Sequence, residues 1–147
     1  MASPIYFFRK GEPFSELSNF AFSEFEADGV RWPTVEHYFQ AQKFKDAAHR
    51  ERIRGARSPM EAKTLGQTRQ VPIRSDWETV KEEVMKKALR LKFQNPHLRS
   101  LLLSTKNRML VEDSPYDRYW GCGRDEKGKN RLGILLMEVR DEIRKAA

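Results

Sequence analysis

The chain has 147 residues, and its 28 Lys and Arg against 21 Asp and Glu give a net charge of +7. This length is typical of one domain that buries a hydrophobic core without needing disulfide bonds or metal ions. No stretch approaches the roughly 18 to 20 apolar residues of a membrane span, and we expect no signal peptide. The single cysteine, Cys122, excludes an internal disulfide and a cysteine-based zinc site, so a reducing, cytoplasmic setting is expected.

The first strands are predicted from short apolar runs and one turn. Residues 5–8 (IYFF) are expected to form a short strand. Residues 22–25 and 30–32 flank the pair Asp28-Gly29, which is typical of a hairpin turn.

A helix is expected to follow, with Thr34 as its N-cap and its end near Arg54, just before Gly55. Capping boxes and an Asn-Pro pair mark three more helices, which start near Ser58, Ser75 and Asn95. In the helix after Ser75, the expected core-facing stripe consists of Trp77, Val80, Val84, Ala88 and Leu91. Residues 109–112 (MLVE) predict another short strand. The last helix should bury Leu132, Leu135, Leu136, Val139 and Ile143.

The fold class that follows is mainly α, a compact helical domain with a few short β-strands. No linker, repeat or low-complexity segment divides the chain, so a single domain is expected over residues 1–147. Residues 114–130 stand out as an irregular segment, because unstructured segments of this length inside a domain are usually functional or disordered. Its aromatic residues argue against disorder, and its glycines, Gly121 among them, allow backbone amides to approach a ligand.

The first helix carries three polar residues at helical spacing. Glu36, Gln40 and Lys43 are separated by four and three residues, so they share one face. One interpretation is a solvated surface stripe. The aromatic residues on both sides instead indicate a largely buried helix, where Lys and Glu are rare unless they are paired or functional. A lysine in an apolar site has a lowered pKa and is a usable nucleophile.

Two carboxylates lie near the irregular segment. Glu112 ends the predicted strand, and Asp117 is close to Trp120 in the loop. Such groups serve as acid, base or stabiliser of an oxocarbenium-like centre. For Asp117 the alternative, a loop residue that makes an Asx-type turn, stays open.

Asn130, ahead of the last helix, has two interpretations. It is an ordinary helix N-cap, or it helps to hold a phosphate at a helix N-terminus with the preceding Gly and Lys. No His or Cys set has metal-ligand spacing, so neither a metal site nor another cofactor is expected.

Seven segments of the chain together resemble the NADAR superfamily, also called YbiA-like proteins. The matching segments are FSELSNF (14–20), VRWPTVEHYFQAQKF (30–44), SPMEAKTLG (58–66), DWETVKEEVMKKALRLKF (76–93), LLLST (101–105), LVEDSPYDRYWGCG (110–123) and GKNRLGILLMEVR (128–140). They cover nearly the whole chain in order. Each segment alone is ordinary, but the set is highly specific.

The resemblance implies the mainly helical fold of this family and an N-glycosidase (EC 3.2.2 type) that needs no cofactor. Some relatives hydrolyse ribosylamino-pyrimidinone intermediates of the riboflavin pathway, and others remove ADP-ribose from guanine in nucleic acid. The expected catalytic residues are Lys43, Glu36, Asp117 and Glu112. The expected substrate-binding residues are Arg9, Asn19, Trp32, His37, Gln40, Trp120, Gly121 and Asn130.

The chemistry allows two mechanisms. A ribosyl group on an exocyclic amine is a glycosylamine, whose ring can open so that a neutral Lys43 attacks C1 and forms a Schiff base. Glu36 or Asp117 would then transfer protons, and Glu112 would have an orienting role. Direct attack by water is the alternative, in which Lys43 only stabilises charge.

Three functions compete. The first is hydrolysis of a small phosphorylated ribosyl metabolite, and the second is hydrolysis of ADP-ribosylated guanine in nucleic acid. The third is a non-catalytic module that binds ADP-ribose or nucleotides. The trio Glu36, Lys43 and Asp117 argues against the third, because a pure binder has no need for it. No obligate protein partner and no membrane is expected.

Overall fold

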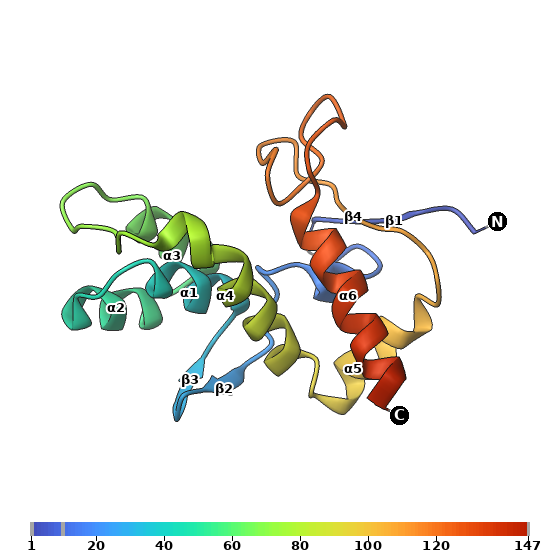
Figure 1. The fold of residues 1–147 in the computed structure, drawn as a ribbon, viewed down its shortest axis with the longest axis horizontal. Coiled ribbons are helices and arrows are strands. Elements are labelled where there is room, and N and C mark those ends of the chain that lie inside the picture. Colours follow the sequence, from blue (N-terminus) through green and yellow to red (C-terminus); the bar gives the residue numbers. More distant parts are fainter. Residues whose placement is uncertain (1, 10, 147) are drawn as a thin grey trace. The chain divides into compact units, whose positions relative to one another are not determined.

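The computed structural model describes residues 2–9 and 11–146. The chain falls into two compact units, each described here by itself: residues 19–92 form one, and the segments before Asn19 and after Lys92 form the other. Six α-helices and four short strands occur among the described residues (Figure 1), which confirms the mainly α fold class. No described helix is both long and apolar enough to cross a membrane. A single domain over residues 1–147 stays a prediction.

The unit of residues 19–92 contains one hairpin and four helices (Figure 1). Strands β2 (Phe25–Ala27) and β3 (Val30–Trp32) pair antiparallel, as the Asp28-Gly29 turn predicts. Both turn residues have positive φ, 54° and 78°, the geometry of a two-residue primed turn. The helices are α1 (Val35–Gln42), α2 (Ala47–Arg54), α3 (Pro59–Gly66) and α4 (Trp77–Lys92).

The prediction of a single helix from Thr34 to Arg54 is wrong, because this segment forms two helices, α1 and α2. Thr34 caps α1 as predicted, since its hydroxyl accepts a hydrogen bond from the backbone N–H of His37. The helix ends at Gln42 because the next backbone groups bond elsewhere: Lys43 O accepts from Arg74 N–H at 2.8 Å. Asp46 then caps a new helix by accepting from His49 N–H. Lys43 is therefore the C-cap of α1.

The stripe expected on α4 is partly wrong. Trp77 and Ala88 are buried, but Val80, Val84 and Leu91 are only half-buried. The buried face instead continues through Met85, Leu89 and Lys92. The buried face of α4 therefore follows a spacing of four residues from Trp77, through Met85 and Leu89. Lys81 is at the position of this series between Trp77 and Met85.

The other unit contains the remaining elements. Strands β1 (Ile5–Phe7) and β4 (Leu110–Glu112) pair in parallel, in the register of Ile5 with Leu110. Helices α5 (Pro96–Ser104) and α6 (Arg131–Ala146) complete it. Asn95 caps α5 as the Asn-Pro pair predicts. The final helix buries the expected leucines and valine, while Ile143 is half-buried.

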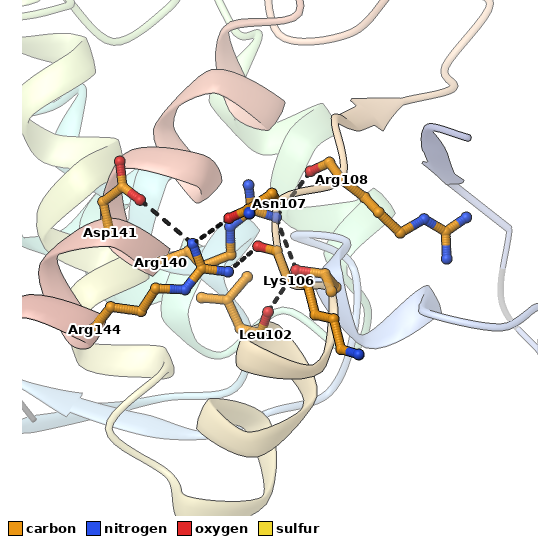
Figure 2. Close-up of polar contacts among 8 residues, drawn as sticks. Leu102, Lys106, Asn107, Arg108, Arg140, Asp141 and Arg144 are labelled. Atoms are coloured by element: carbon orange, nitrogen blue, oxygen red, sulfur yellow. Dashed lines mark hydrogen bonds and ion pairs between the residues drawn. The ribbon is translucent and has the colours of Figure 1, made fainter. Parts of the chain in front are cut away.

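Two arginines of α6 hold the turn that follows α5 (Figure 2). Arg140, which is 4% exposed, donates to Thr105 Oγ1 and to Arg108 O, both at 2.9 Å. Arg144 donates to Lys106 O and to Asn107 Oδ1. These bonds satisfy two backbone carbonyls and two polar side chains of the turn after α5. They place β4 by fixing the turn that leads into it.

Candidate functional site

The stripe on α1 is buried, as the flanking aromatic residues predict. Glu36 is 7% exposed and Gln40 is 5% exposed. Gln40 Nε2 donates to Glu36 Oε2 at 2.6 Å, so the amide orients the carboxylate. A charge-assisted bond of this kind is about twice as strong as a neutral one. The two side chains therefore form one rigid polar pair.

Lys43 completes the stripe at the end of α1. Its Nζ donates to the backbone carbonyl of Gly66 on α3 at 3.1 Å. Burial lowers the pKa of the Lys43 amine; the negative charges of Glu36 and Glu78 oppose this, and the positive charges of Lys63 and Lys81 add to it. A lowered pKa raises the fraction of neutral amine, which is the form that attacks an electrophile.

Gly66 also determines the position of Gln40. A Cβ on Gly66 would overlap the amide of Gln40, with 2.7 Å to its Cδ and 3.0 Å to its Cβ. The missing side chain therefore gives the Gln40 amide its space, while the Gly66 carbonyl holds Lys43. Gly66 was not among the expected site residues, and no local pattern signals this close approach.

Two more expected substrate residues in this unit have buried polar atoms without a protein partner among the described residues. They are Asn19 Oδ1 and Trp32 Nε1, on side chains that are 6% and 5% exposed. Gln40 Oε1 is a third. An unsatisfied buried group costs about 1–3 kcal/mol, so two acceptors and one donor are retained at a cost to stability.

His37 belongs to the same helix but is bonded within the protein. Its Nδ1 lies 2.7 Å from Thr34 Oγ1, and its Nε2 lies 3.0 Å from Ala56 O. Burial lowers the pKa of His37 and favours the neutral ring. The ring ties the start of α1 to the segment after α2, and a direct substrate contact by His37 stays a prediction.

In the other unit, Asn130 fastens the end of β4. Its Oδ1 accepts from Glu112 N–H and its Nδ2 donates to Leu110 O, each at 2.9 Å. Its backbone adopts φ 50°, a left-handed conformation that Asn tolerates. The Asn130 side chain thus bonds strand β4, whereas the helix N-cap interpretation had expected it to bond α6. Phosphate binding by Asn130 stays a prediction.

Glu112, Asp117 and Gly121 lie together in this unit. A Cβ on Gly121 would lie 2.6 Å from Glu112 Oε2 and 3.1 Å from Asp117 O. Asp117 Oδ1 accepts from the N–H groups of Tyr119 and Trp120 at 2.9 and 2.8 Å. Asp117 therefore makes the Asx-type turn that was one of its two interpretations, and its carboxylate sets the path of the loop.

The remaining expected residues are Trp120 and Arg9. The Trp120 ring is half-buried and packs edge-on against Tyr119, with 4.8 Å between ring centroids. Arg9 is exposed. The convergence of Lys43 and Glu36 with Glu112, Asp117 and Trp120 on one pocket stays a prediction.

Metal binding and surface hollows are two further features of the described residues. No group of three or more His, Cys, Asp and Glu side chains there is placed to hold a metal ion. Two shallow hollows of about 230 and 370 Å³ lie in the unit of residues 19–92. Neither of these two hollows is lined by Glu36 or Lys43.

Comparison with known proteins identifies the family. A family model described as the NADAR domain matches residues 6–144. The chain belongs to the NADAR family. It is 52% identical over 140 residues to "N-glycosidase YbiA" of Escherichia coli (strain K12), covering 95% of this chain and 88% of that one. It is 42% identical to "Riboflavin biosynthesis protein PYRR, chloroplastic" of Zea mays, covering 95% of this chain and 25% of that protein.

A solved structure agrees with this assignment. The NMR structure of Escherichia coli YbiA matches with a TM-score of 0.91 and 50% identity, covering 98% of this chain and 86% of that one. The resemblance drawn from the seven sequence segments is thereby confirmed.

Proposed function

We propose that this NADAR chain is an N-glycosidase that hydrolyses the bond between C1 of a phosphorylated ribose and an exocyclic amino nitrogen, as in ribosylamino-pyrimidinone intermediates of riboflavin biosynthesis. The observation that carries the proposal is the buried stripe: a half-buried amine, Lys43, beside an oriented carboxylate, Glu36. Relatives named N-glycosidase at 52% identity, and a riboflavin biosynthesis protein at 42%, support the activity and its substrate class. We place the reaction in the cytoplasm.

The proposed reaction begins with opening of the ribose ring. The lone pair of the exocyclic nitrogen forms a C1=N bond while the bond from C1 to the ring oxygen breaks, and that oxygen takes a proton. The neutral Lys43 amine then adds to C1. Glu36, whose carboxylate accepts a hydrogen bond from Gln40, takes the proton that the amine loses in this proposal.

The second half of the reaction releases both products. The bond from C1 to the heterocycle nitrogen breaks, the nitrogen leaves with a proton as a free amine, and a Schiff base joins C1 to Lys43. Water adds to this imine, the C1–Nζ bond breaks, and the aldehyde closes to ribose 5-phosphate. Proton transfer by Asp117 and orientation by Glu112 stay predictions of the same proposal.

The test is a parallel assay of two substrates, the ribosylamino-pyrimidinone 5′-phosphate and DNA with ADP-ribosylated guanine. The proposal expects release of the free amine and ribose 5-phosphate from the first. Lys43→Ala should abolish turnover, while Lys45→Ala, which changes an exposed neighbour, should not. A purified wild-type protein that cleaves neither substrate contradicts the proposal.

The second candidate is hydrolysis of ADP-ribosylated guanine in nucleic acid. It is favoured by the hollow of about 370 Å³, which Arg74, Lys87 and Arg90 line together with Asp28 and Glu83. Cations at such a groove suit a phosphate backbone, although two acidic residues reduce the local charge. Turnover of the DNA substrate that falls steeply with salt would favour this candidate over the first.

A further inference from the structure

Lys81 lies on the face of α4 that is turned towards α1. It is four residues after Trp77 and four before Met85, so the three share one face. The Trp77 ring packs against Phe39 of α1 with 5.0 Å between centroids. Met85 Sδ accepts from Asn19 Nδ2 at 3.4 Å. The Lys81 side chain, between these two contacts, is only 17% exposed.

These contacts also fix the level of Lys81 along α1. Asn19 O accepts from the backbone N–H of Glu36 at the start of α1. Because Asn19 also bonds Met85, Met85 lies near the start of α1. Trp77 contacts Phe39, which lies almost one turn further along α1 than Glu36. Lys81 lies between these levels and therefore faces the first turn of α1, between Glu36 and Phe39.

A second lysine flanks the stripe from α3. Lys63 is half-buried and precedes Gly66 by three residues, which places both on one face of α3. Gly66 is the residue whose carbonyl holds Lys43. The positive charges of Lys63 and Lys81 both act to lower the pKa of Lys43, which agrees with this placement.

We propose that Lys63 and Lys81 bind the phosphate group on C5 of the ribose whose C1 reacts with Lys43. This inference rests on the proposed function and names the specificity subsite of that same reaction. Lysine is a point charge with three donors, well suited to a phosphate. A ribose bound with C1 at Lys43 extends its C5 away from the nucleophile, towards flanking cations.

Charge balance around the stripe supports the subsite. Lys43, Lys63 and Lys81 carry three amines, against the carboxylates of Glu36 and Glu78. Lys81 Nζ pairs with Glu78 Oε1 at 2.6 Å, but the Glu78 side chain is 80% exposed. The exposed carboxylate of Glu78 is screened by solvent, so this pair holds Lys81 only weakly.

The subsite fits two sources of the same chemistry. A ribosylamino-pyrimidinone 5′-phosphate has a monophosphate on this C5, and ADP-ribose linked through C1 has a pyrophosphate there. Both substrates should therefore depend on Lys63 and Lys81. A ribosylamino-pyrimidinone without phosphate should not.

The experiment measures kcat/KM for the phosphorylated and dephosphorylated ribosylamino-pyrimidinone, and for ADP-ribosylated guanine DNA. Lys81→Gln and Lys63→Gln should each lower kcat/KM about ten- to a hundredfold on phosphorylated substrates, the size of one charge-assisted bond. Both should leave the dephosphorylated substrate nearly unchanged, and Lys81→Arg should retain most activity. The matched control is Lys45→Gln, which removes the same charge from an exposed position of the same unit.

Binding of ribose 5-phosphate and of ribose, measured by NMR titration, tests the subsite without turnover. Wild type should bind the phosphorylated sugar more tightly, and the Gln variants should lose that difference. Equal losses on both substrates would mean that Lys81 acts through Lys43 or through folding, and would overturn the inference. Equal affinity of wild type for the two sugars would also overturn it, and this result holds even if a variant fails to fold. Phosphate-dependent binding without any turnover would instead contradict the proposed function alone.

Discussion

Lys43 Nζ donates a hydrogen bond of 3.1 Å to the backbone carbonyl of Gly66, a residue 23 positions away on α3. The same glycine leaves the space that the Gln40 amide fills. One residue without a side chain therefore holds the amine in place and allows the amide to orient Glu36. The geometry of the stripe depends on the close packing of α3 on α1.

Gly66→Ala is expected to lower both stability and activity. Alanine favours helix by about 1 kcal/mol over glycine, but the new methyl group would overlap the buried Gln40 amide. Overpacking of this kind costs about 1–3 kcal/mol, so destabilisation should win. Thermal unfolding and kcat with the ribosylamino-pyrimidinone 5′-phosphate measure the two effects.

Gly55→Ala is the matched control, because a Cβ there meets only Glu51 O at 3.5 Å and Arg52 O at 4.0 Å. It should leave stability and kcat close to wild type. If Gly66→Ala behaves like this control, Gln40 has room to move and the packing argument is wrong.

Glu36→Gln is expected to lower kcat by about 10²- to 10⁴-fold, the usual contribution of a positioned acid or base. The replacement keeps the volume of the side chain and still accepts from Gln40 Nε2, so stability should change little. Glu26→Gln, on the exposed side of β2, provides the control. A fall in kcat of less than about threefold would assign Glu36 a merely structural part.

The pH dependence of kcat should report the ionisation of Lys43. The attacking form is the neutral amine, so the rate should rise with pH as Lys43 loses its proton. Because burial lowers the pKa of Lys43, this rise should come below the usual lysine value of about 10.4. Glu78→Gln removes a negative charge that favours the ammonium form, so the rise should move to lower pH by a fraction of a unit. A shift in the opposite direction would show that another group controls the profile.

Asn130→Ala is expected to destabilise the protein. The change leaves Glu112 N–H and Leu110 O without their side-chain partner, and each unsatisfied buried group costs about 1–3 kcal/mol. Alanine also tolerates φ 50° less well than asparagine. Urea unfolding measures the loss. Unchanged stability with a raised KM would instead support the phosphate contact predicted from the sequence.

Much of the fold could be predicted from local signals. The Asp28-Gly29 turn, the Thr34 and Asn95 caps, and the last helix are determined by residues close together in the sequence, and the structure confirms them. The break after Gln42 was missed because its cause is distant: Arg74 N–H bonds Lys43 O. Helical spacing alone cannot predict a hydrogen bond between residues so far apart in the sequence.

The candidate site shows the same division. The spacing of Glu36, Gln40 and Lys43 predicted a shared face, and all three lie on buried or half-buried positions. The position of Lys81, four residues from Trp77 and four from Met85, is also a local signal, but the sequence offered Val80 and Val84 as a more apolar stripe. Gly66 could not be found this way, because its role comes from tertiary packing against Gln40.

The covalent route through Lys43 makes the sharpest prediction. If the amine attacks C1, borohydride added during turnover should reduce the imine and attach the sugar to the protein. Mass spectrometry should locate the adduct on Lys43, and Lys43→Ala should show neither adduct nor turnover. Lys45→Ala, at the exposed neighbouring position, should be trapped like wild type.

Lys43→Arg separates the covalent role from an electrostatic one. Guanidinium stays protonated and cannot form the imine, so a covalent mechanism expects loss of several orders of magnitude in kcat and no adduct. An electrostatic role expects the opposite, because arginine keeps the positive charge beside the Gly66 carbonyl. Thermal unfolding of the variant checks that it is folded. If folded Lys43→Arg turns over within about tenfold of wild type, a difference of only about 1.4 kcal/mol in barrier height, the Schiff-base mechanism is wrong and water attacks C1 directly.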